Sequence, residues 1–172
     1  HVTVVAPDGP RSGMSNAITP LHPLYLRELN DPNWGIEEWQ KNASVYTTNG
    51  TPSDCVKLAL DVLFEGDPSR INLLASGINH GSNAAINVIY SGTMGAVFVG
   101  AEHGIPSIGY SIDDHSMDAD FSYFEPYILE LTRHLIEEGM TYGVCYNVNA
   151  PTGALEGVRW TRQCRGFWQK EM

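Results

Sequence analysis

Short apolar runs of strand length alternate with helix-like stretches along most of this chain. The strand-like runs span residues 2–6, 45–48, 71–75, 106–112 and 144–148, and the helix-like stretches span residues 52–65, 93–103 and 121–138. Strands separated by helices are typical of parallel βαβ units with right-handed crossovers. The alternation therefore predicts an α/β fold built on a doubly wound, mainly parallel sheet.

The first helix has the clearest start signal. Thr51 is suited to cap it, Pro52 stands at its first position, and Asp54 follows three residues after the cap. Outside these helices and strands, the sequence predicts extended chain at residues 18–29 and 158–163. It predicts a surface insertion at residues 30–43.

Composition narrows the function classes. The 172 residues predict one domain, residues 1–172, and a net charge of −10 disfavours a nucleic acid polymer as partner. No run approaches the ~18 apolar residues of a membrane span, so no membrane association is expected. The three cysteines form no CxxC pair, which favours reduced thiols in a cytoplasmic compartment.

The segment 71–93 carries the strongest functional signal. An apolar run predicted as a strand stops at Ser76-Gly77, Asn79 and Asn83 follow, and Ser91-Gly92-Thr93 opens a helix predicted to begin at Thr93. Loops after parallel strands bind ligands in open α/β sheets, and a helix start with free N–H groups and hydroxyls suits an anion. The segment therefore predicts a phosphate or metal–phosphate site.

Polar clusters also follow two other predicted strands, at residues 8–15 and 50–54. In a parallel sheet these loops gather at one edge. Gly, Ser, Asn and Asp are also ordinary turn residues, which explains any one cluster by itself. Three convergent clusters favour a site.

Individual residues leave alternatives open. Arg11 could face a phosphate or be a surface arginine, and Ser12 could ligate a hard cation or be a turn residue. Asn79 could donate a carbonyl oxygen to Mg²⁺ or Mn²⁺ or bind its own loop, and neutral oxygens alone hold such cations weakly. Asp8 is a candidate carboxylate, whereas Asp54 fits a helix cap better.

Other clusters have plainer interpretations. His80 fits a surface role, and the acidic loop of Asp113, Asp114, His115, Asp118 and Asp120 fits a solvated face better than a weak cation site. The close-set Arg159, Arg162 and Arg165 could steer an anion or contact another subunit. GxGxxG and GxxxxGK are both absent, which argues against a dinucleotide-binding oxidoreductase domain.

Six motifs occur in one order: Val-Val-Ala-Pro-Asp with Arg-Ser-Gly-Met-Ser, Gly-Thr-Pro-Ser-Asp-Cys-Val-Lys-Leu, Ser-Gly-Ile-Asn, Tyr-Ser-Gly-Thr, Gly-Ile-Pro-Ser-Ile and Val-Arg-Trp-Thr-Arg-Gln. In this combination the chain resembles the survival protein SurE family from residue 1 to about residue 168. The resemblance implies a three-layer, Rossmann-like α/β fold. It also implies a metal-dependent acid phosphatase that hydrolyses nucleoside 5′- or 3′-monophosphates with one Mg²⁺ or Mn²⁺, usually as a dimer or tetramer.

The resemblance also assigns roles to residues. It makes Ser12 and Asn79 metal ligands, and it places Ser91, Gly92 and Thr93 at the phosphate with Asn83 nearby. By the same resemblance, Asn79 and Thr93 take part in catalysis: the metal polarises the phosphoryl group and the helix start stabilises developing charge.

Three departures from the family pattern qualify that inference. The family begins with a strand ending in Asn-Asp-Asp-Gly, whose aspartates complete the metal site, and it ends with a hairpin and tail. Neither is found here, so the sequence is expected to be a fragment of a longer enzyme. Asn87 stands where an aspartate is common. The alternative function is therefore a non-catalytic nucleotide-binding module.

Overall fold

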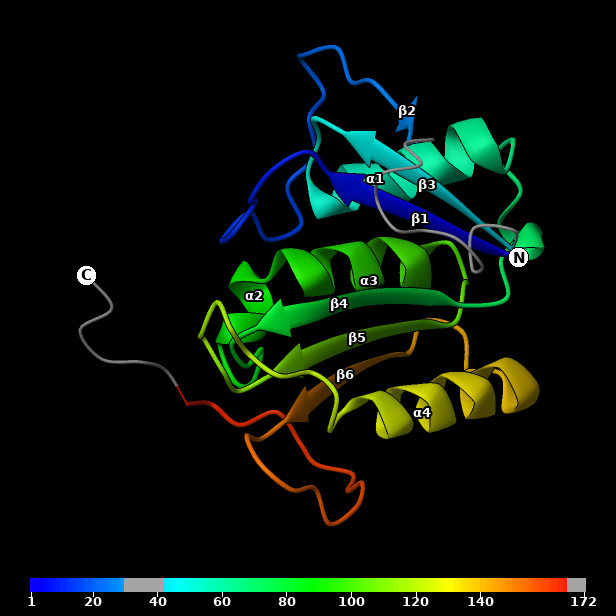
Figure 1. Ribbon diagram of the computed structural model, residues 1–172. Coiled ribbons are helices and arrows are strands. Elements are labelled where there is room, and N and C mark those ends of the chain that lie inside the picture. The colour runs from blue at the N-terminus through cyan, green and yellow to red at the C-terminus, as the bar shows by residue number, and fades with distance from the viewer. Residues whose placement is uncertain (30–41, 167–172) are drawn as a thin grey trace.

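The computed structural model describes residues 1–29 and 42–166 (Figure 1). Its first sheet has the strand order β1-β3-β2. Strands β1 (Val2–Pro7) and β3 (Ala43–Thr48) run parallel, and the two-residue β2 (Arg27–Glu28) pairs antiparallel with β3. The predicted insertion at 30–43 lies almost wholly outside the described residues.

The second sheet is wholly parallel. It has the order β4-β5-β6, with β4 at Leu74–His80, β5 at Ser107–Ile112 and β6 at Cys145–Ala150. The predicted parallel α/β architecture is confirmed. Among the described residues the strands divide between two hydrogen-bonded sheets, because no ladder joins β1 to β4.

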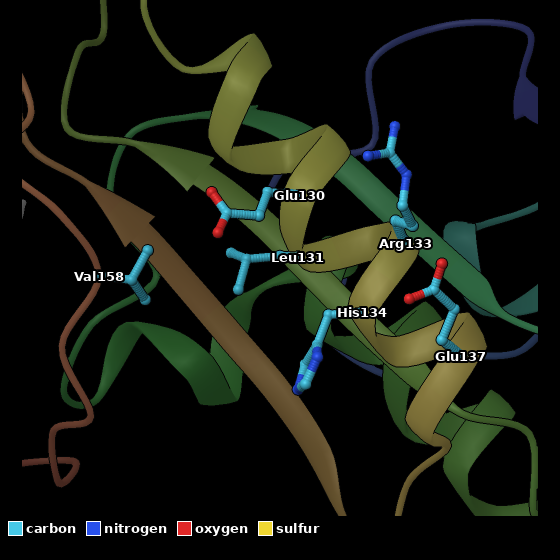
Figure 2. A pocket seen from close by; sticks show the side chains of 6 residues that line it. All are labelled: Glu130, Leu131, Arg133, His134, Glu137 and Val158. Carbon is cyan, nitrogen blue, oxygen red and sulfur yellow. The ribbon is translucent and has the colours of Figure 1, made fainter.

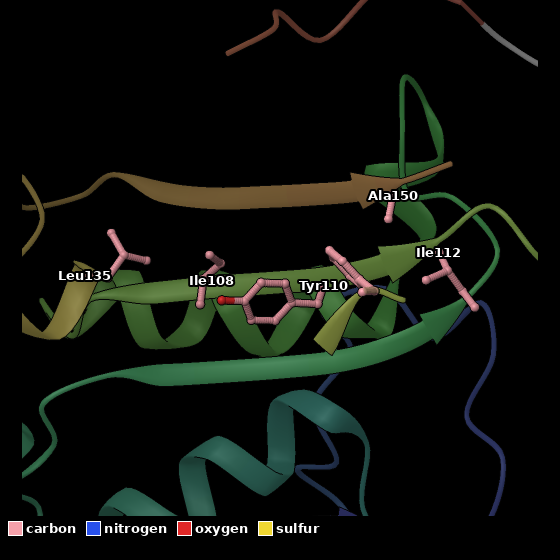
Figure 3. Packing of buried hydrophobic residues seen from close by; sticks show 6 residues of the cluster. Ile108, Tyr110, Ile112, Leu135 and Ala150 are labelled. Carbon is pink, nitrogen blue, oxygen red and sulfur yellow. The ribbon is translucent and has the colours of Figure 1, made fainter. Parts of the chain in front are cut away.

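Strand β5 shows how the layers form, since all six of its residues are buried. Successive side chains of a strand point to opposite faces. Ile108, Tyr110 and Ile112 pack with Leu135 of α4 (Glu125–Glu138) on one face (Figure 3). On the other face, Ser107 and Gly109 lie against α3 (Gly92–Glu102). The second sheet is thus covered by a helix on each side.

Helices α1 (Pro52–Leu58) and α3 join the two halves of the structure. Val56 and Leu60 pack against Ala96 and Val99 in a second hydrophobic cluster. Helix α1 continues as a π-helical turn, η3 (Ala59–Leu63), and the predicted start at Thr51 is confirmed as a complete capping box with Asp54. A short 3₁₀ turn, η4 (Pro68–Arg70), leads to β4.

Strand β4 differs from its prediction. Ser76-Gly77 is not the end of the strand, because pairing with β5 continues to His80 after a register shift between Ser76 and Asn79. Gly77 has φ +122°, and a Cβ there would collide with the carbonyl oxygen of Tyr110. A glycine in a strand commonly marks such a bulge rather than a turn.

Other predicted boundaries also shift. Helix α3 begins at Gly92 rather than Thr93, because Ser91 is its cap, and a short helix, α2 (Asn87–Tyr90), was not predicted. Helix α4 begins at Glu125, four residues after its predicted start at residue 121. Most of residues 18–29 and all of residues 158–163 form no strand. None of the helices in the described part of the chain has the length and apolar character needed to span a membrane.

Candidate functional site

The strands β1, β4, β5 and β6 end on the same side of the molecule, where their arrowheads lie in Figure 1. The loops that follow carry Ser12 after β1 and Asn83 after β4, while Asn79 lies near the end of β4 itself. Helix α3 also begins at this edge. The expected loops therefore gather on one side of the molecule, although β1 belongs to the first sheet and β4 to the second.

The N-terminus of α3 is built from three residues. Ser91 is nearly buried and its hydroxyl accepts a hydrogen bond from the Met94 N–H at 3.1 Å. In the described part of the chain, the N–H groups of Gly92 and Thr93 have no acceptor. The first N–H groups of a helix carry partial positive charge and can bind an anion. Ser91 therefore shapes this helix start, and the two following N–H groups remain available to a ligand.

Thr93 combines a packing role with an unused hydroxyl. Its methyl carbon lies 3.6 Å from the position that a Cβ on Gly109 of β5 would take. No hydrogen bond to its hydroxyl appears within residues 1–29 and 42–166. The methyl thus fixes the side chain on the sheet while the hydroxyl stays free for a ligand.

The loop after β1 reaches the start of α3. The Arg11 carbonyl oxygen lies 3.6 Å from the position of a Cβ on Gly92, so Ser12 follows a residue that is close to the helix start. No hydrogen bond joins Ser12 to Asn79 in the described structure, and their meeting in one pocket with Thr93 stays a prediction.

Arg11 is committed to the loop rather than free for a phosphate. Its guanidinium binds Asp8 at 2.6 Å and donates to the carbonyls of Gly50 and Asn49. The second oxygen of Asp8 accepts from the Tyr25 hydroxyl at 2.7 Å. This bond, together with Arg11, holds the pKa of Asp8 below its usual value. Asp8 is therefore no free metal ligand, and the surface-arginine interpretation of Arg11 is the better one.

A second set of contacts fixes the middle of this loop, and the sequence did not reveal it. Ser15 donates from its hydroxyl to the Ile89 carbonyl and from its N–H to the Tyr90 carbonyl, which joins the loop to α2. A Cβ on Gly95 would collide with the Ser15 carbonyl oxygen, so that position of α3 requires glycine. Loop and helices are packed as one unit.

Asp54 anchors the far end of the same loop. Its carboxylate accepts from the N–H and hydroxyl of Thr19 and from the Thr51 N–H. Burial opposes ionisation, but the hydrogen bonds from Thr19 and Thr51 outweigh it and the pKa of Asp54 lies below its usual value. Burial beside this charge raises the pKa of Cys55 to about 12, so that thiol is no nucleophile.

Asn79 has the geometry of an oxygen donor. Its Nδ2 donates to the carbonyls of His80 at 3.0 Å and Gly81 at 2.7 Å. Both amide hydrogens are thereby used, and no described donor binds its Oδ1. The side chain is oriented with an unused carbonyl oxygen.

Asn83 is nearly buried and held from three sides. Its Nδ2 donates to Ser111 Oγ at 2.8 Å, its N–H donates to Asn149 Oδ1 at 2.7 Å, and its carbonyl accepts from Asn147 Nδ2 at 2.9 Å. The sequence analysis did not single out Asn147 or Asn149. Their alternation on β6 was the signal, since residues two apart share one face of a strand.

The oxygen atoms of Asn79 and Ser12 are of the chemical type that binds a hard cation. Asn79 Oδ1 and Ser12 Oγ are neutral oxygens of the type that Mg²⁺ and Mn²⁺ accept. Within the described ranges, no group of three or more His, Cys, Asp or Glu side chains is placed to hold a metal. These residues therefore supply part of a ligand set, without its carboxylates.

The other polar clusters have structural explanations. Asp114 and Asp120 accept from the N–H groups of Ser116 and Ser122, which is ordinary turn capping, and His80 binds the Ser116 carbonyl. The three arginines of the 159–165 stretch are exposed. The solvated-face interpretation of the acidic loop is therefore the better one.

Two open cavities are lined by other residues. One of about 400 Å³ is lined by side chains of α4 and by Val158 (Figure 2): Glu130, Leu131, Arg133, His134 and Glu137. The other, of about 480 Å³, is lined by Ile78 of β4 and by Phe121, Ser122, Glu125, Ile128 and Leu129. Neither is lined by Ser12, Asn79 or Thr93.

Comparison with known proteins places the chain among relatives. The family model described as survival protein SurE matches residues 1–170. A protein named 5′-nucleotidase SurE from Phocaeicola vulgatus is 47% identical over 99% of this chain and 63% of its own length. The protein of that name from Bacteroides thetaiotaomicron is 43% identical over 99% of this chain and 62% of its own length.

The structural comparison agrees. The crystal structure of the SurE protein from Aquifex aeolicus superposes with a TM-score of 0.76 at 31% identity, over 93% of this chain and 60% of that one. The chain thus spans less than two thirds of the length of these relatives.

Proposed function

Since the chain belongs to the survival protein SurE family, we propose that it forms part of a divalent-metal-dependent phosphomonoesterase that hydrolyses nucleoside 5′- and 3′-monophosphates. The observation that carries the proposal is the start of α3. Two N–H groups, at Gly92 and Thr93, lie beside the threonine hydroxyl at the carboxyl edge of the second sheet, and none of the three has a partner among the described residues.

The proposed phosphate contacts follow from this geometry. The N–H groups of Gly92 and Thr93 donate to non-bridging phosphate oxygens, and the Thr93 hydroxyl adds a third donor. Ser91 contributes by capping, because its hydroxyl accepts from the Met94 N–H and so fixes the first turn of α3. Donors that already point at the phosphoryl group stabilise the charge that grows on its oxygens in the transition state.

Ser12 and Asn79 would hold one Mg²⁺ or Mn²⁺ together with carboxylates that the family resemblance assigns to an upstream Asn-Asp-Asp-Gly. Such a cation polarises a phosphoryl oxygen and lowers the pKa of bound water. A cation also answers an electrostatic requirement, because a chain of net charge −10 otherwise repels a phosphate dianion. The role of this chain is to present the two neutral oxygens in fixed positions.

Two further parts of the proposal concern the compartment and the oligomeric state. The three cysteines are all free thiols, which fits a reducing compartment such as the cytoplasm. A homodimer or homotetramer is proposed from the family resemblance alone.

Hydrolysis of AMP, 3′-AMP and p-nitrophenyl phosphate, with and without Mn²⁺, tests the proposal. The chain is compared alone and with an added upstream strand ending in Asn-Asp-Asp-Gly. We expect Mn²⁺-dependent phosphate release that rises strongly with the added segment, because carboxylates complete the ligand set.

Thr132→Val, a hydroxyl loss on α4 that removes a hydrogen bond with Tyr110, serves as the control and should leave turnover unchanged. Phosphate binding without turnover in the extended chain would support a non-catalytic binding module instead. Turnover that is independent of metal would refute the metal site.

A further inference from the structure

From the hydrogen bonds at the end of β6, we infer that Asn149 is a positioning residue for the candidate phosphate site and that Asn147 assists it. This inference rests on the proposed function, because it concerns how the same site is held. The two amides tie the loop of residues 81–86 to the sheet, and this loop leads through α2 into the start of α3.

The side chain of Asn149 makes three hydrogen bonds. Its Oδ1 accepts from the Ser82 hydroxyl at 3.1 Å and from the Asn83 N–H at 2.7 Å. Its Nδ2 donates to Asn147 Oδ1 at 3.0 Å. Two donors converge on one carbonyl oxygen, so Asn149 fixes two successive residues of the loop at once.

Asn147 completes the bridge. Its Nδ2 donates to the Asn83 carbonyl at 2.9 Å, while its Oδ1 accepts from Asn149. The two side chains therefore hold Asn83 by both its backbone groups, and Ser111 of β5 holds its side chain. Amide bonds arranged in a chain polarise and strengthen one another.

Further hydrogen bonds connect this loop to the start of α3. Asn87 Nδ2 donates to the Ser82 carbonyl at 3.2 Å, which fixes the first residue of α2 to the residue that Asn149 holds. The last residues of α2 in turn accept hydrogen bonds from Ser15 of the loop that carries Ser12. A continuous set of hydrogen bonds thus runs from β6 to both sides of the candidate site.

The test compares Asn149→Ala, Asn149→Asp and the control Thr132→Val. Aspartate keeps an acceptor for Ser82 and Asn83, loses the donor to Asn147 and adds a negative charge. Thr132→Val removes a comparable hydrogen bond, the one to Tyr110 at 2.8 Å, on the opposite side of the sheet. Two quantities are measured: amide hydrogen exchange at Asn83 and the affinity for inorganic phosphate.

Asn149→Ala should speed exchange at Asn83 about tenfold and weaken phosphate binding about three- to tenfold, as expected for the loss of a net hydrogen bond. Asn149→Asp should restore the exchange rate at Asn83 to within about twofold, because it keeps the acceptor. Its added charge repels phosphate, so phosphate affinity is compared only between Asn149→Ala and Thr132→Val. Thr132→Val should change neither, although it lowers the unfolding temperature.

Unchanged exchange at Asn83 in Asn149→Ala would overturn the inference, and so would equal weakening of phosphate binding by Thr132→Val. If Asn149→Ala does not fold, Asn147→Ala at its exposed position decides by the same two measurements. If the unchanged chain binds no phosphate, the proposed function fails, whereas the exchange data still decide whether Asn149 orders the loop.

Discussion

The carboxylate of Asp54 accepts hydrogen bonds from both the N–H and the hydroxyl of Thr19, at 3.0 and 2.6 Å. The same carboxylate accepts from Thr51 at the start of α1. A helix cap therefore doubles as the anchor of the loop that carries Ser12. The site loop and the first helix are held by one charged group.

Asp54→Asn should destabilise the protein by about 1–3 kcal/mol, because an amide NH₂ then meets hydrogen-bond donors in a buried position. Asp67→Asn is the matched control, since Asp67 caps the exposed η4 turn with bonds only to Ser69. It should cost less than about 1 kcal/mol. Urea unfolding measures both, and equal costs would show that Asp54 acts only as a local cap.

The pH dependence of that stability has a defined sign. The pKa of folded Asp54 lies below its usual value of 3.8. Its contribution is therefore complete above about pH 4 and is lost as the pH falls through the lower folded value. The difference in unfolding free energy between wild type and Asp54→Asn, measured from neutral pH down to strongly acidic pH, should shrink only at the acid end. A difference that is constant throughout would contradict this assignment.

The sequence predicted the presence of the helices and strands better than the residues at which they begin and end. Thr51, Pro52 and Asp54 mark a helix start by local chemistry, so that start was predictable. Ser76-Gly77 imitates a turn, because the reason for Gly77 is its close approach to Tyr110 of a neighbouring strand. Local patterns cannot report such a tertiary contact.

In the candidate site too, features set by local sequence were predictable and features set by tertiary contacts were not. The Ser-Gly-Thr helix start was predictable within one residue, since caps are local. The roles of Arg11 and Asn149 were not, because their partners lie about 40 and 66 residues away in the sequence. A guanidinium beside a serine suggests a phosphate ligand until the carbonyls that it binds are seen.

Substitutions at Ser91 separate its role as a helix cap from the binding of phosphate at the start of α3. Ser91→Ala should destabilise the protein by about 0.5–2 kcal/mol through loss of the cap. Ser91→Asp keeps a good cap and places a negative charge at the helix start. It should preserve the thermal unfolding temperature and weaken inorganic phosphate binding about tenfold or more, because like charges a few ångströms apart repel. Calorimetry checks both, and unweakened binding in Ser91→Asp would move the phosphate away from α3.

Thr93 tests the hydroxyl itself. Thr93→Val keeps the methyl that faces Gly109 and removes the hydroxyl, so the fold should survive. Loss of a hydrogen bond to a charged group costs about 1.5–3 kcal/mol, or roughly a 10- to 150-fold fall in kcat/KM for p-nitrophenyl phosphate. Thr93→Ser retains the hydroxyl and should keep most of the activity. Full activity in a folded Thr93→Val protein would remove Thr93 from the site.

The most direct test of the account uses the protein with the added upstream strand ending in Asn-Asp-Asp-Gly. It is a map of Mn²⁺ on that protein by paramagnetic broadening of amide NMR signals, in the presence of inorganic phosphate. The account predicts that broadening centres on Ser12, Asn79 and the Gly92–Thr93 helix start, and that Asn79→Ala abolishes it there. Broadening centred instead on the acidic loop of residues 113–120, or on the α4 cavity beside His134, would contradict it.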